Sequence, residues 1–119
     1  MDTKSAIIDS NTFKIALYDV PDVDVQDPNV VPIVIPVKLL DPEALDLISL
    51  CVRSIQKFTK YPYRIWLVDN NSDPELSNQL KELNNVTIIF NKTVNPKKGN
   101  HSYENAVGLE IARKFINPE

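Results

Sequence analysis

Short apolar runs alternate along the chain with stretches in which apolar residues recur every three or four positions. The short runs are rich in β-branched and bulky residues, which is typical of strands buried on both faces. They lie at 30–37, 64–68 and 86–90. Pro32 and Pro36 lie inside the first run and are expected to place its ends.

The stretches with helical spacing follow these runs in turn. They predict helices from 41 to about 60, from 73 to about 85 and from about 102 to 115. Asp41-Pro42 and Asp73-Pro74 are strong helix starts, because Asp suits the N-cap and Pro suits the first helical position. The order βαβαβα predicts an α/β fold, Rossmann-like and three-layered (α/β/α), with a mainly parallel sheet.

The first 29 residues differ from the rest. Residues 1–11 are polar and unpatterned and predict a loose lead-in. Thr12–Val20 alternates apolar and polar positions, which predicts an edge strand or an arm laid on the sheet. Pro21–Asn29 is acidic and predicts an extended linker. The expected division is therefore an N-terminal arm and linker at 1–29 and an α/β domain at 30–119.

Polar residues occur where the predicted strands end. Lys38 follows the first strand, Asp69 and Asn70 follow the second, and a polar, basic loop at 91–101 follows the third. Carboxyl ends of parallel strands share one edge of a sheet, where ligands of α/β proteins bind, so we expect a site there. Asp and Asn after a strand are also ordinary turn formers, and that alternative remains open.

Composition excludes several classes of function. The net charge of −3 does not supply the basic field of a general nucleic-acid-binding surface. One cysteine and one histidine leave no His-rich or Cys-rich metal site, and two glycines, Gly99 and Gly108, leave no P-loop or dinucleotide fingerprint. No apolar run is long enough to span a bilayer and no signal pattern starts the chain, so a cytoplasmic protein is expected.

Several motifs taken together resemble the family 2 glycosyltransferases of the GT-A fold. The matching segments are the runs 31–37, 50–55 and 65–73, followed by Asn95, Gly99 and the run 105–109. The resemblance covers nearly everything after residue 30 and implies the nucleotide-binding half of such an enzyme. The implied donor is a nucleotide-diphospho-sugar, with a UDP-sugar as the expected partner.

The resemblance also implies site residues. Pro36, Val37 and Lys38 would frame the base and ribose, and Asp69 would accept a hydrogen bond from the base. Asn70, Gly99 and Asn105 would lie beside the ribose and diphosphate. Lys97, Lys98 and His101 would either add favourable charge there or form a solvated loop.

The family's metal-binding Asp-x-Asp and catalytic base are expected beyond Glu119. No catalytic or metal-binding residue is therefore predicted here, and Mg²⁺ or Mn²⁺ is expected only together with that missing half. We therefore expect this chain to form an incomplete domain that is inactive alone. Its sheet would have an exposed edge through which two copies could associate. The alternative is a non-catalytic α/β protein-interaction module. A receiver domain is rejected because its first strand would end in acidic residues, not in Pro-Val-Lys.

Overall fold

The three apolar runs form three adjacent parallel strands. The structure, a computed structural model, describes residues 2–8, 11–19, 29–93 and 101–116. The strands are β3 (Val31–Val37), β4 (Tyr63–Asn70) and β5 (Val86–Asn91). β4 lies in the middle and is parallel to both neighbours, as the pattern predicts.

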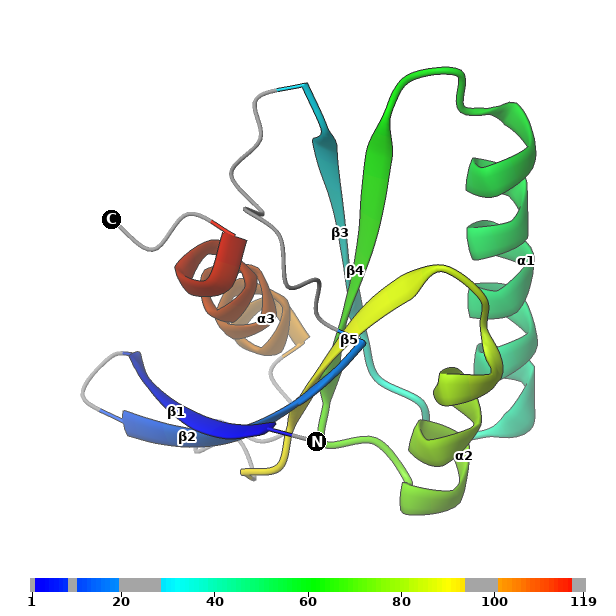
Figure 1. Cartoon of the computed structure of the whole chain (residues 1–119). Helices are drawn as coiled ribbons and strands as arrows, with labels where there is room; N and C mark the ends of the chain where they lie inside the picture. Colours follow the sequence, from blue (N-terminus) through cyan, green and yellow to red (C-terminus); the bar gives the residue numbers. More distant parts are fainter. Residues whose placement is uncertain (1, 9–10, 20–28, 94–100, 117–119) are drawn as a thin grey trace.

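The N-terminal residues extend this sheet with two further strands. β1 (Asp2–Ile8) and β2 (Asn11–Tyr18) are antiparallel to each other, and β2 is antiparallel to β5. The strand order is β1-β2-β5-β4-β3, so the described chain is an α/β domain with a mixed sheet of five strands and three helices (Figure 1). The prediction of a mainly parallel sheet is thus wrong, because two of the four strand pairs in the described sheet are antiparallel.

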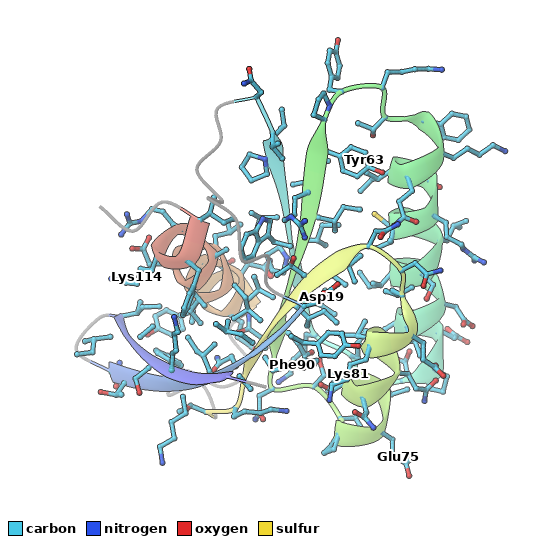
Figure 2. All side chains as sticks on the ribbon, in the orientation of Figure 1. Asp19, Tyr63, Glu75, Lys81, Phe90 and Lys114 are labelled. Atoms are coloured by element: carbon cyan, nitrogen blue, oxygen red, sulfur yellow. The ribbon has the colours of Figure 1, made fainter. Side chains whose placement is uncertain are left out.

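Two expectations for the N-terminal segment are corrected by this hairpin. Residues 2–8, expected to be a loose lead-in, form a strand, because backbone pairing with β2 does not require an alternating side-chain pattern. β2 is an interior strand instead of an edge, with Phe13 and Ile15 fully buried. Side-chain contacts tie it further to β5: the Lys81 ammonium lies 5.5 Å from the ring centre of Tyr18 and 5.6 Å from that of Phe90 (Figure 2).

The helices begin where the Asp-Pro pairs place them. In α1 (Pro42–Phe58) the Asp41 carboxylate accepts from the Ala44 N–H at 2.9 Å. In α2 (Pro74–Gln79) Asp73 accepts from the Glu75 N–H at 3.0 Å. The second helix is shorter than expected and continues as the 3₁₀ turn η1 (Leu80–Glu82), while α3 spans His101–Ile116.

Alternate residues of the central strand β4 face two separate hydrophobic clusters. Ile65 and Leu67 pack in one cluster with Val52 of α1 and with Leu76 of α2. Trp66 and Val68 pack in the other with residues of α3, of β2 and of β1. α1 and α2 therefore lie on one side of β3–β5 and α3 on the other (Figure 1).

β3 forms one edge of the described sheet, and its prolines restrict what that edge offers. The Val31 N–H points toward β4 and donates to the Pro62 carbonyl at 2.9 Å. The backbone nitrogens of alternate residues point the other way, and two of these belong to Pro32 and Pro36, which have no N–H. The edge expected from the sequence exists in this part of the chain, but it is poor in donors for a further strand.

Candidate functional site

The carboxyl-terminal ends of β3, β4 and β5 bring the predicted polar residues together. Val37 lies opposite Asp69 in the sheet register, and Asn70 lies opposite Asn91. Lys38 follows β3 directly. The expected gathering at one edge is therefore present. We call this group (Lys38, Asp69, Asn70, Asn91 and Glu104) the polar edge.

Asp69 holds the turn after β4 in place. Its side chain is buried, with Oδ1 accepting from the Ser72 hydroxyl and Oδ2 accepting from the Ser77 hydroxyl at 2.6 Å. The Ser72 hydroxyl oxygen in turn accepts from the Leu39 N–H at 2.6 Å. This carboxylate therefore connects the end of β4, the helix α2 and the segment that leaves β3.

The electrostatic state of Asp69 reflects two opposing effects. Burial raises the pKa of its carboxyl above the ordinary value of 3.8, because the charged form loses hydration. The hydroxyls of Ser72 and Ser77 and the charge of Lys92 act in the other direction. Both carboxylate oxygens already have a serine donor, although a carboxylate offers about four acceptor positions.

Asn70 is buried and joins β5 and α3 to the same edge. Its Nδ2 donates to the Glu104 carbonyl at 2.7 Å, and its Oδ1 accepts from Asn91 Nδ2 at 3.2 Å. The Asn91 Oδ1 accepts from the Thr93 N–H at 3.1 Å. The amide of Asn70 thus uses both ends to fix the position of neighbouring elements.

Lys38 closes the polar edge on the side of β3. Its ammonium donates to the Asn70 carbonyl at 2.9 Å and to the Asn71 carbonyl at 3.1 Å. The Glu104 Oε2 lies 3.7 Å away, and the Glu104 side chain is buried whereas that of Lys38 is 34% exposed. The ammonium compensates a buried carboxylate, while part of the Lys38 side chain remains exposed to solvent.

Gly108 lets α3 approach this edge closely. A Cβ at this position would lie 3.1 Å from Asn70 Nδ2 and 3.3 Å from the Pro36 Cβ. A larger residue would push the helix away, and the contact between Asn70 and Glu104 would be strained.

Of the predicted site residues, Pro36, Val37, Lys38, Asp69 and Asn70 lie together at the strand ends. Asn105 is exposed on α3, one position after Glu104. Gly99, Lys97, Lys98 and the side chain of His101 lie outside the described residues.

Several contributors to this edge carry no role in the predictions from sequence. Ser72 and Ser77 could have been suspected, because a buried Asp at a strand end needs donors. Asn91, by contrast, was expected at this edge, because it begins the polar loop that follows the third predicted strand. Glu104 gives no local signal beyond an acid in the first turn of α3.

Within residues 2–8, 11–19, 29–93 and 101–116, no three His, Cys, Asp or Glu side chains gather so that they could hold a metal ion. The metal implied by the resemblance is therefore not assigned to described residues.

Across residues 2–8, 11–19, 29–93 and 101–116, no helix has the length and apolar character needed to cross a bilayer.

Comparison with known proteins adds no assignment: no family model, curated protein or solved structure matches the chain at a significant level.

Proposed function

We propose that this domain binds the nucleotide of a nucleotide-diphospho-sugar at the polar edge, as part of a glycosyltransferase related to family 2. In this proposal the helices and sheet are the nucleotide-binding half of a three-layer, Rossmann-like GT-A fold. The observation that carries it is the 2.9 Å hydrogen bond from the Lys38 ammonium to the Asn70 carbonyl, which joins the ends of β3 and β4. Ligands of open α/β sheets bind at that edge.

The contacts favour a division of roles among the site residues. Pro36 and Val37 provide the apolar end of β3, and the exposed face of Lys38 is available to a ribose or diphosphate oxygen. Asn105 is exposed on the adjacent α3 and is in a position to add a polar contact. Asp69 is 2% exposed, so a base would reach its spare acceptor positions only if the residues that cover it moved.

These residues are proposed to bind the nucleotide and not to catalyse the transfer of the sugar. Transfer by an inverting enzyme needs a base for the acceptor hydroxyl and a cation for the leaving diphosphate. Neither is assigned among the described residues. We expect UDP to bind at the polar edge in a manner that does not depend on Mg²⁺, because the contact proposed for the diphosphate is made by Lys38.

A titration of the isotopically labelled protein with UDP, with and without Mg²⁺, tests this proposal. We expect amide shifts to change at Val37, Lys38 and Asn70 and the apparent affinity to fall in Lys38→Met. Lys60→Met is the matched control, because Lys60 is an exposed lysine beyond the end of α1. A folded protein whose amides do not respond to saturating UDP would contradict nucleotide binding.

A second candidate function is a non-catalytic protein-interaction module. It is favoured by the internal use of the polar groups: Asp69 serves two serines, and the Lys38 ammonium faces two carbonyls and a carboxylate. Such an edge needs no ligand to be satisfied. This candidate predicts no response to UDP while the fold stays intact, so the same titration separates the two.

A further inference from the structure

α1 carries a second apolar face that the fold leaves exposed. Its buried side, with Val52 and Ile48, packs against the sheet. Outside this buried side, Leu47, Leu50 and Phe58 are 67%, 56% and 69% exposed. Their spacing of three and eight residues places them on one face of the helix. In Figure 1 α1 lies at the border of the molecule, with the sheet on one side and no labelled element on the other.

Charged residues beside this face are divided between the two ends of the helix. Glu43 and Asp46 lie in its first half, and Arg53 and Lys57 lie in its second half. All four are exposed. Glu43 and Lys57 are equally far from Leu50 along the helix, and Asp46 and Arg53 are placed almost as symmetrically.

We propose that this face joins two copies of the chain, with the α1 helices antiparallel and a two-fold axis near Leu50. In that arrangement the Leu50 side chains meet at the axis, while Leu47 and Phe58 of each copy cover the partner helix. Glu43 of each copy then lies near Lys57 of the other, and Asp46 near Arg53. A two-fold interface needs a surface that is complementary to itself when reversed, and this face has that property.

Helix stability alone explains only part of the pattern. Acids near the start and bases near the end of a helix also suit its dipole. The dipole gives no reason for three large apolar side chains to lie exposed beside those charges. Exposed apolar residues that form one patch rimmed by charge are typical of a protein interface.

The α1 face is also a better candidate for self-association than the β3 edge. Pro32 and Pro36 remove two N–H donors that a strand added to that edge would need. The α1 face requires no backbone pairing. The inference is independent of nucleotide binding, because no polar-edge residue belongs to this face.

Sedimentation equilibrium over a wide range of concentration is the first test. We expect the wild type to show a reversible monomer–dimer equilibrium and Leu50→Glu to weaken association by more than about tenfold, because the charge is buried at the centre of the interface in both copies. Leu109→Glu is the matched control, since Leu109 is 49% exposed on α3. A wild type that stays monomeric throughout would overturn the proposal.

Charge reversal gives a sharper test of the antiparallel geometry. Glu43→Lys should weaken the dimer, because the introduced ammonium would then face Lys57 of the other copy at both ends. The double variant Glu43→Lys/Lys57→Glu should restore association close to that of the wild type. A dimer that resists Leu50→Glu, or that the double reversal fails to restore, would show that another surface is used.

The chain's single cysteine offers an independent readout. Cys51 is exposed and adjoins Leu50, so in the proposed dimer the two thiols lie near the axis. A short thiol-specific crosslinker should give covalent dimer efficiently with the wild type. The variant Cys51→Ser/Leu109→Cys, which moves the thiol to α3, should crosslink poorly at equal concentration. Equal yields would contradict the arrangement.

Discussion

The ammonium of Lys38 lies 2.9 Å from the carbonyl oxygen of Asn70 and 3.7 Å from the carboxylate of Glu104. One side chain therefore connects the ends of β3 and β4 to the first turn of α3. Because the Glu104 carboxylate is buried, its negative charge would destabilise the fold without the Lys38 ammonium beside it.

Replacing Lys38 by Met should destabilise the fold by about 1–3 kcal/mol, since it removes two hydrogen bonds and leaves the Glu104 carboxylate without its cation. The free energy of unfolding in urea measures the loss. Lys60→Met should change it by less than about 0.5 kcal/mol, as expected for an exposed surface residue.

The pairing itself is tested by adding Glu104→Gln to Lys38→Met. The neutral amide no longer needs a cation, so the double variant should recover part of the lost stability. If the two substitutions were simply additive, Lys38 would not be compensating Glu104.

Ser77→Ala should cost about 1–3 kcal/mol at neutral pH, because it leaves one oxygen of the buried Asp69 carboxylate without its donor. The same change should raise the pKa of Asp69 further, since the hydroxyl favours the charged form. Urea unfolding and the carboxyl carbon shift of Asp69 measure the two effects. Ser102→Ala, at an exposed position of α3, should alter neither.

The stability of the fold should depend on the protonation of Asp69. Its pKa in the folded state is raised above 3.8 by burial, so the folded protein binds this proton more tightly than the unfolded chain does. The resulting contribution is complete below pH 3.8 and is lost as the pH rises through the raised pKa.

The difference in unfolding free energy between the wild type and Asp69→Asn isolates this effect. It should fall as the pH rises above 3.8 and level off once Asp69 is ionised in the folded state. A difference that instead rises as the pH approaches 3.8 from below, and then stays level, would mean that the serine hydrogen bonds outweigh burial and that the pKa is lowered.

Gly108→Val should destabilise the fold by about 2–3 kcal/mol, because the new side chain would press on Asn70 and Pro36, which already lie within 3.1 and 3.3 Å of the Cβ position. Ala106→Val is the matched control on the exposed side of the same helix and should cost less than about 1 kcal/mol through helix propensity. Thermal unfolding of both variants compares them directly, and equal losses would show that α3 does not approach this closely.

Local chemistry explains which parts of the fold were predictable. Asp41 and Asp73 cap helices through N–H groups only a few residues away, so the Asp-Pro pairs were sufficient. The three parallel strands were visible as continuous apolar runs. β4 and β5 are buried on both faces as such runs predict, whereas β3, at the edge of the sheet, is mostly half-buried or exposed. β1 was missed, since its pairing with β2 depends on backbone groups and leaves little trace in side-chain order.

The amino-acid sequence by itself determined the parallel strands, the helix starts and the meeting of Lys38, Asp69 and Asn70 at one edge, because periodicity, capping and strand direction are local or follow from topology. The tertiary structure alone decided the partners. Asn70 donates to the carbonyl of Glu104, 34 positions further along the chain, and Lys38 forms an ion pair with the side chain of the same residue on α3. Such contacts depend on how elements pack in space, which no local pattern of the chain records.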